Sequence, residues 1–330
     1  MQSEPFTCQV VPTVVVRLGA EDDHRKHKAE HKGRKYSLKV RPLLSICFAP
    51  FVFRFVLFVV PLALVLRERN IMVHIIAIIP ARMGSSRFPG KPLARILGRP
   101  MIEHIFRRAA MCDLLDAVYV ATCDEEIRRV AEGFGAPVLM TSPAHERASD
   151  RVAEAAAEFD ADIVVMIQGD EPMITPCMIA SAVAPMIEDS SVTCVNLARR
   201  IFNWQEYFDR NTIKVVMDVH GDALYFSRSP IPTLEFADVE RGAAFKQVCV
   251  IPFRRDFLRE VARLPQTPLE RAESIDMLRV IENGRRVRMA PTEVDTHAVD
   301  TAEDLRLVES LMKDDPLVLR YGTPRMEARL

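Results

Sequence analysis

A loop that follows an apolar stretch carries residues suited to binding phosphate. Residues 75–80 are apolar and rich in Ile, and the loop behind them contains Arg82, Gly84, Ser85, Ser86, Arg87, Pro89, Gly90 and Lys91. Glycine lets a ligand approach the backbone closely, hydroxyls and amides can bind oxygen atoms, and cations can neutralise phosphates. Open α/β sheets bind nucleotides just beyond the ends of their strands. The loop is therefore a candidate phosphate site, and a basic surface turn is the equally simple alternative.

Asp170 is a candidate metal ligand. It lies in the turn 169–172, directly after the apolar run 162–168. Side chains at the end of such a strand face the ligand crevice of an α/β sheet, and a carboxylate there suits a magnesium ion shared with phosphates. An ordinary turn with a solvated acid is the alternative.

Two further positions can be explained either by local structure or by chemistry. Asp300 precedes a helical segment in which Thr301 and Asp304 have the spacing of a capping box, so a helix cap is the plain explanation and a second metal carboxylate is the other. Arg228 follows a strand and can hold an anionic group or lie on the surface. The segment 145–151, HERASDR, is typical of a helix cap with a solvated charge cluster.

Strands and helices alternate regularly in the first half of the chain after residue 72. The pattern predicts strands at 73–80, 116–122, 137–141 and 162–168, and helices at 100–111, 124–134, 149–159 and 176–188. Such alternation with short connections predicts a mostly parallel sheet covered on both faces. Further strands are expected at 192–198, 213–219, 223–226, 247–253 and 287–290, and helices at 255–263, 268–282 and 301–313. We expect a frayed chain after Asp315.

Composition excludes several classes of protein. The chain has 330 residues, 49% apolar and 27% charged, with a net charge of −1, which does not favour a general nucleic-acid binder. Its seven cysteines are scattered without a CxxC pair. This argues against a disulfide scaffold or a structural zinc site and fits a reducing cytosol.

The first 72 residues do not fit the rest of the chain. A basic run at 25–41 precedes an apolar segment at 43–66 that is interrupted by Pro50, Arg54 and Pro61. The segment is long enough to span a bilayer, but Arg54 disfavours this, and the basic flank would then place the phosphate loop outside the cytosol. We expect the domain to begin at Met72, with 1–72 as upstream sequence outside the fold. A genuine anchor and a targeting or disordered segment are the alternatives. The expected domain is 73–315, with a tail at 316–330.

A series of motifs resembles one enzyme family over about residues 73–313. They are IIPARMGSSRFPGKPL, VATCDEE, HERASDRVAEA, IQGDEPMI, IKVVMDVHGDALYFSRSPIP, TPLERAESIDMLR and VDTAEDL. In this order they resemble the CMP-KDO synthetases, the 3-deoxy-manno-octulosonate cytidylyltransferases. The resemblance implies a three-layer, Rossmann-like α/β nucleotidyltransferase fold of the GT-A-like type and a homodimer. It also implies transfer of CMP from CTP to a 2-keto-3-deoxy sugar acid, in the cytoplasm, for lipopolysaccharide or cell-surface polysaccharide biosynthesis.

The resemblance also implies roles for individual residues. The CTP phosphates would be held by Arg82, Ser85, Arg87 and Lys91, and Gln168 would lie at the nucleotide. Asp170 and Asp300 would bind Mg²⁺, which replaces the capping explanation of Asp300. The catalytic set is then Lys91, Arg82, Asp170 and Asp300. The sugar acid would be bound by Arg228, Gln247, Glu270 and Glu273. With no His or Cys of the motifs placed as a nucleophile, we expect direct in-line displacement at the α-phosphorus.

Two departures from the family pattern bear on the acceptor. Arg147 and Ala148 replace a Ser-Gly pair, which adds bulk and charge beside the nucleotide or at the mouth of the sugar site, and Gln247 replaces a His near the sugar acid. The acceptor is therefore KDO, a related 2-keto-3-deoxy sugar acid or an amino variant. The rival functions are a nucleotidyltransferase for a different acidic or neutral sugar and a catalytically silent CTP-binding relative. Arg228 counts against a neutral sugar, and Lys91, Asp170 and Asp300 count against silence.

Overall fold

The computed structural model describes residues 73–84 and 88–322. The predicted extension 1–72, with its apolar segment 43–66, lies outside the described residues, as do Ser85, Arg87 and residues 323–330. Within the described part, no helix combines the length and hydropathy needed to cross a membrane.

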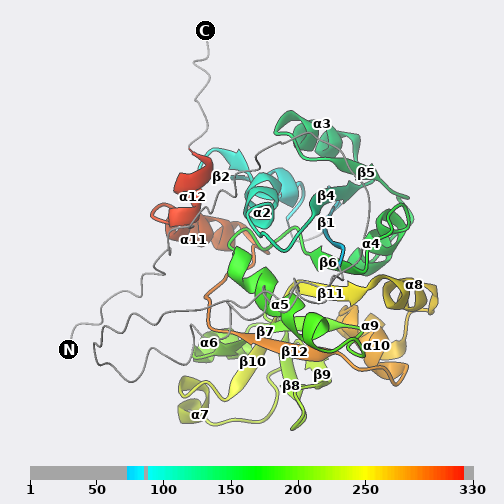
Figure 1. The fold of residues 1–330 in the computed structure, drawn as a ribbon. Coiled ribbons are helices and arrows are strands. Elements are labelled where there is room, and N and C mark those ends of the chain that lie inside the picture. Colours follow the sequence, from blue (N-terminus) through cyan, green and yellow to red (C-terminus); the bar gives the residue numbers. More distant parts are fainter. Residues whose placement is uncertain (1–72, 85–87, 323–330) are drawn as a thin grey trace, which may run out of the picture. The chain divides into compact units, whose positions relative to one another are not determined.

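A five-stranded sheet carries the first half of the fold. Its order is β11-β6-β1-β4-β5 (Figure 1), with β1 at Ile75–Ala81, β4 at Ala117–Thr122, β5 at Val138–Met140, β6 at Ile163–Ile167 and β11 at Val250–Arg254. The first four of these strands in the chain pair in parallel, and β11 pairs antiparallel to β6. The predicted mostly parallel sheet is confirmed.

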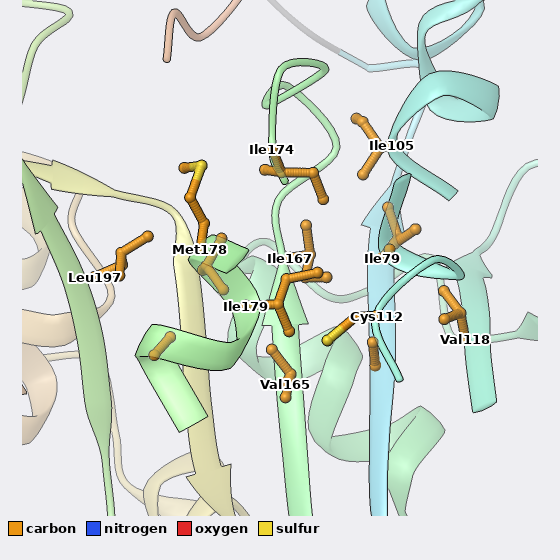
Figure 2. Close-up of a cluster of buried hydrophobic side chains, with 14 of the residues drawn as sticks. Ile79, Ile105, Cys112, Val118, Val165, Ile167, Ile174, Met178, Ile179 and Leu197 are labelled. Carbon is orange, nitrogen blue, oxygen red and sulfur yellow. The ribbon is translucent and has the colours of Figure 1, made fainter. Parts of the chain in front are cut away.

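The two central strands are buried on both faces. Ile75, Ala77 and Ile79 of β1 belong to one apolar cluster, whereas Ile76 and Ile78 belong to another. The first cluster includes side chains of α2 (Met101–Ala109) and α5 (Pro176–Glu188), and the second includes side chains of α4 (Ala148–Ala156) and α8 (Arg255–Arg263). Figure 2 shows part of the first cluster, where side chains of β1, β6, α2 and α5 point toward one another. Helices on both faces of a sheet give the predicted three-layer arrangement.

A second five-stranded sheet was not predicted as a separate layer. Its order is β12-β7-β10-β8-β9, with β7 at Val195–Ile201, β8 at Lys214–Met217, β9 at Ala223–Ser227, β10 at Ala244–Val248 and β12 at Arg288–Thr292. All its pairings are antiparallel except that of β12 with β7. The single strand predicted at 247–253 is wrong, because the chain leaves this sheet after Val248 and enters the first sheet at Val250.

The helix predicted at 268–282 is also interrupted. It consists of α9 (Pro268–Glu273) and α10 (Met277–Glu282), and Ser274 between them has a φ of 57°. A residue in the left-handed region ends a helix, and serine carries no sequence signal for that conformation as glycine does. The remaining elements are η1 (Lys91–Leu93), β2 (Arg95–Ile96), β3 (Arg99–Pro100), α3 (Glu125–Gly133), α6 (Trp204–Phe208), α7 (Phe236–Glu240) and α11 (Ala302–Met312).

The end of the chain is more ordered than predicted. Residues Pro316–Tyr321 form α12, where the sequence predicts a frayed tail. Asp315 caps this helix and pairs with Arg108 of α2, whose side chain is fully buried. Tyr321 contributes a hydroxyl 2.8 Å from Nδ1 of the buried His104. Buried polar partners on α2 therefore hold this segment, and its own sequence does not contain that information.

We predict that Asp315→Asn lowers the free energy of unfolding by about 2–3 kcal/mol, because it leaves the buried Arg108 without its anionic partner. Asparagine can still cap α12, so the change isolates the ion pair. Urea denaturation measures the effect, and Asp314→Asn, at an exposed neighbouring position, is the matched control. Equal stability of the two variants would show that the pair contributes nothing.

Candidate active site

Lys91, Asp170 and Asp300 are far apart in the sequence and meet at one point in the structure. Lys91 Nζ donates to Asp170 Oδ2 at 2.9 Å and to Asp300 Oδ1 at 3.1 Å. Burial by itself lowers the pKa of Lys91, but the two carboxylates outweigh it and raise that pKa above its usual value. The charged ammonium therefore holds together two carboxylates that would otherwise repel each other.

The loop after β1 is shaped to deliver Lys91. Gly90 adopts a φ of 71° and donates its N–H to the carbonyl of Met83, which folds the loop back on itself just before η1. The N–H of Met83 is in turn held by Asp124 Oδ2 at 2.8 Å. Asp124 occupies the N-cap position of α3 without a side-chain cap bond, and its carboxylate anchors the loop instead.

Asp170 is held by a close approach of two strand ends. A Cβ atom on Gly169 would lie 2.9 Å from the carbonyl oxygen of Pro80, so the turn after β6 can pass β1 only with glycine at this position. Gln168 donates its N–H to the carbonyl of Cys249, which ties the turn to the link between the two sheets. Asp170 Oδ1 is buried and has no hydrogen-bond partner among the described residues.

The segment before α11 brings Asp300 beside Asp170. The N–H of Val299 donates to the carbonyl of Asp170 at 2.9 Å. The predicted capping box is present and consists of Thr301 and Asp304, so helix capping does not use the carboxylate of Asp300. That carboxylate faces Lys91 instead. The capping explanation is therefore confirmed for Thr301 and Asp304, and the metal role of Asp300 stays a prediction.

Lys91 and Asp170 line a cavity of about 560 Å³, which we call the cationic cavity. The carboxylates on its wall are Glu146 and Asp170. The cations on its wall are Arg82, Lys91, Arg147, Arg151, Arg210 and Arg228. Arg147 and Ala148, which depart from the family pattern, both line this cavity. Its charge suits an anion with several negative groups.

Arg151 is a site residue that the sequence analysis missed. The segment 145–151 was predicted to be solvated, but Arg151 is buried and donates to the Thr141 hydroxyl. One of its terminal nitrogens is buried without a hydrogen-bond partner among the described residues, on the wall of the cationic cavity. The signal in the sequence is its position on α4, four residues before Ala155 on the helix face that packs into the core.

A second cavity of about 390 Å³, the polar cavity, is lined mainly by carboxylates and amides. They include Glu171, Asn203, Gln205, Glu206, Asp209, Gln247, Asp300 and Asp304. Four residues line both cavities, namely Gln168, Asp170, Asn211 and Arg228. The two cavities therefore adjoin at Asp170 and Arg228, and a group bound in one can reach a group bound in the other.

The structure brings two of the four predicted sugar-acid residues to a cavity wall. Arg228 lines both cavities, and Gln247 lines the polar cavity, where its side-chain amide donates to Asn196 Oδ1 at 2.5 Å. Glu270 and Glu273 line neither cavity. Glu270 is fully buried against Arg279, and Glu273 accepts hydrogen bonds from the backbone N–H of Arg228 and from the Ser227 hydroxyl. Both glutamates support neighbouring residues.

Glu171 and Lys246 form a buried network that the sequence did not reveal. Glu171 accepts a hydrogen bond from the Thr296 hydroxyl at 3.0 Å, and burial, followed by the charge of Asp170, raises its pKa to about 7. Lys246 Nζ donates to Glu206 and to the carbonyl of Thr296. Thr296 thus links the turn that carries Asp170 to the segment that leads to Asp300.

The site offers charge and position rather than a nucleophile. Cys249 lines the polar cavity, but burial and then the charge of Glu171 raise the pKa of its thiol well above the usual value, so it stays protonated. Among the described residues, no group of three or more His, Cys, Asp or Glu side chains could hold a metal by itself. Asp170 and Asp300 can supply two carboxylates, which suits a Mg²⁺ ion whose other ligands are phosphates and water.

Comparison with known proteins identifies the family. The sequence profile of a cytidylyltransferase family matches residues 76–287. The 3-deoxy-manno-octulosonate cytidylyltransferase of Geobacter metallireducens is 46% identical over 249 residues, which cover 72% of this chain and 98% of the relative. The enzyme of the same name from Syntrophotalea carbinolica is 46% identical over 246 residues, with the same coverage.

Solved structures agree with this result. A CMP:2-keto-3-deoxy-manno-octonic acid synthetase complexed with CTP superposes with a TM-score of 0.67 at 38% identity, over 72% of this chain and 98% of that one. A 4-diphosphocytidyl-2C-methyl-D-erythritol synthase from Anaerococcus prevotii has a TM-score of 0.51 at 14% identity, over 73% of this chain and 99% of that one, and supports the fold alone. Because relatives at this level of identity are matched over nearly their whole length, the chain belongs to the 3-deoxy-manno-octulosonate cytidylyltransferase family.

Proposed function

We propose that this protein transfers CMP from CTP to 3-deoxy-manno-octulosonate or a closely related 2-keto-3-deoxy sugar acid and releases pyrophosphate. The observation that carries the proposal is the junction of a cationic and a polar cavity at Asp170 and Arg228. A polyanion and a polyhydroxylated acid can then lie with their reacting groups side by side.

CTP fits the cationic cavity by charge. Lys91, Arg82 and Arg151 line this cavity, and cations that are partly desolvated bind phosphate oxygens strongly. Ser85 and Arg87 belong to the same loop and stay predicted phosphate ligands. Gln168, at the junction, can donate an amide hydrogen bond to the nucleotide.

The sugar acid fits the polar cavity. Carboxylate and amide oxygens there can accept hydrogen bonds from several hydroxyls, as binding of a polyol requires. Arg228 supplies the cationic group for the acid's carboxylate. Because that carboxylate is attached to the anomeric carbon, its binding to Arg228 would bring the anomeric hydroxyl to the junction of the cavities. The ion pair of Lys246 and Glu206 forms another part of the wall of this cavity.

Magnesium is the proposed cofactor. Asp170 Oδ1 is buried without a hydrogen-bond partner among the described residues, and an unpaired carboxylate oxygen of this kind is expensive unless a cation binds it. Asp170 and Asp300 would hold the ion together with phosphate oxygens. When bound, Mg²⁺ would neutralise charge on the α-phosphate and lower the pKa of the attacking hydroxyl.

The reaction is an in-line displacement. The anomeric hydroxyl oxygen forms a bond to the α-phosphorus while the bond to the β-bridging oxygen breaks, pyrophosphate leaves with that electron pair, and the hydroxyl proton passes to solvent. Lys91 and Arg82 offset the charge that develops on the leaving group. Arg228 and the polar cavity hold the acceptor in line, which lowers the entropic part of the barrier.

The family also suggests a cellular setting. We propose that the enzyme acts as a homodimer in the cytoplasm. Its CMP-sugar product would be an activated donor for lipopolysaccharide or another cell-surface polysaccharide.

Asp170→Ala and Asp300→Ala are each expected to reduce pyrophosphate release from CTP by at least about 1,000-fold, because each removes a proposed ligand of the ion that stabilises the transition state. Circular dichroism and thermal unfolding test whether the fold is kept, and Asp314→Ala is the matched control. Near-normal turnover of either site variant, or wild-type turnover that persists in EDTA, would contradict the metal assignment.

With CTP present, the wild-type protein is expected to release pyrophosphate with at least one 2-keto-3-deoxy sugar acid and with no neutral sugar phosphate. The reason is that Arg228 pairs with a carboxylate that a neutral sugar lacks. A panel containing KDO, related acids and amino variants measures this. Turnover of neutral sugar phosphates would favour the rival nucleotidyltransferase function, and CTP binding without turnover on any acceptor would favour a silent relative.

Gln247→His is expected to change the ratio of kcat/KM values among sugar acids by about tenfold, because one side-chain contact in the pocket changes. The KM for CTP should stay the same, since Gln247 lines only the polar cavity. Steady-state kinetics on the same panel provides both values. A changed KM for CTP with an unchanged acceptor ratio would place Gln247 on the nucleotide side.

A further inference from the structure

Two arginines from different parts of the chain contact the same residue. Ser274 lies between α9 and α10 in the left-handed region, with a φ of 57°. Its hydroxyl accepts a hydrogen bond from a terminal nitrogen of Arg147 at 2.7 Å. Its carbonyl lies 3.5 Å from a terminal nitrogen of Arg228, within hydrogen-bond distance. Ser274 therefore connects the residue before α4 with the residue at the junction of the two cavities.

Arg147 is fixed against a rigid base. Besides Ser274, its guanidinium donates to the carbonyl of Glu270 at 3.4 Å and has its Nε 3.5 Å from Glu270 Oε1. Glu270 is fully buried and receives two hydrogen bonds from Arg279, at 2.8 and 2.6 Å. Arg147, on the wall of the cationic cavity, thus holds α9 and the turn after it in place.

The orientation of Arg228 depends on the same turn. Its Nε donates to the carbonyl of Glu273 at 2.7 Å, and its backbone N–H donates to Glu273 Oε2 at 2.9 Å. A further hydrogen bond to the carbonyl of Arg210, at 3.0 Å, fixes the other edge of the guanidinium. A shift of residues 273–274 would therefore turn the guanidinium that lines both cavities.

We propose that Arg147 is a positioning residue that sets Arg228 through Ser274, so that a side chain on the nucleotide wall controls binding of the sugar acid. The proposal rests on the proposed function, because it assumes that Arg228 meets the acid's carboxylate. The link consists of the hydrogen bond from Arg147 to the Ser274 hydroxyl and the contact of Arg228 with the Ser274 carbonyl.

The test separates positioning from direct nucleotide binding. Ser274→Gly removes the hydroxyl, keeps the charge of Arg147 and tolerates the positive φ without strain. We expect it to raise the KM for the sugar acid about tenfold, the loss typical of one hydrogen bond to a charged group. The Kd for CTP, measured by calorimetry without acceptor, should change less than about twofold, since the charge on the nucleotide wall is unchanged.

Four further variants complete the experiment. Arg147→Ala should raise the KM for the sugar acid to a similar extent, and the double variant should show no further rise, because both changes break one link. Arg147→Lys should raise the KM for the sugar acid less than Arg147→Ala does, because lysine also donates to a hydroxyl. Arg271→Ala is the matched control. Arg271 lies on α9, which ends just before Ser274, and its exposed side chain donates to the carbonyl of Gln266.

The outcomes distinguish the two proposals. A wild-type KM for the sugar acid in Ser274→Gly would overturn the inference, as would an Arg147→Ala variant that weakens CTP binding as much as it raises the KM for the acid. A wild-type protein that turns over no sugar acid would overturn the proposed function and this inference with it. Thermal unfolding of Ser274→Gly at or above the wild-type midpoint, combined with the raised KM, supports positioning.

Discussion

The contact of Lys91 with Asp170 and Asp300 is the constraint on which the rest of the site depends. Two carboxylates cannot lie together in a largely buried place unless a cation neutralises them, and the ammonium of Lys91 does so at 2.9 and 3.1 Å. The three residues come from the loop after β1, the turn after β6 and the segment before α11. One ion-pair cluster therefore ties three distant parts of the chain into one wall.

Neighbouring features keep that cluster in place. The lack of a side chain at Gly169 allows the turn after β6 to pass the end of β1. The hydrogen bond from Thr296 to Glu171 and the capping box of Thr301 and Asp304 fix the segment that bears Asp300. The bond between Thr296 and Glu171 satisfies two buried polar groups, which favours this one arrangement of the segment.

Local sequence predicted the elements and the residues that local chemistry determines. The strand before the loop 82–91, the turn at Asp170 and the capping box near Asp300 all carry short-range signals, and the structure contains them.

Local sequence failed to predict the features that tertiary contacts determine. The run 247–253 is uniformly strand-like, so only pairing shows that it divides between two sheets. Ser274 interrupts a helical pattern without a glycine, and the burial of Arg151 depends on the packing of α4. The family resemblance implied that Glu270 binds the sugar acid, and in the structure its carboxylate is buried and bonded to Arg279.

The break at Cys249, where the chain passes from β10 to β11, has an evolutionary consequence. The walls of the polar cavity come largely from the second sheet and its connections, whereas the loop after β1 and the start of α4 line the cationic cavity. Substitutions in the second sheet can therefore reshape the polar cavity while the loop after β1 and the start of α4 stay the same. The two cavities draw on largely different stretches of the chain, so one of them can change during evolution without the other.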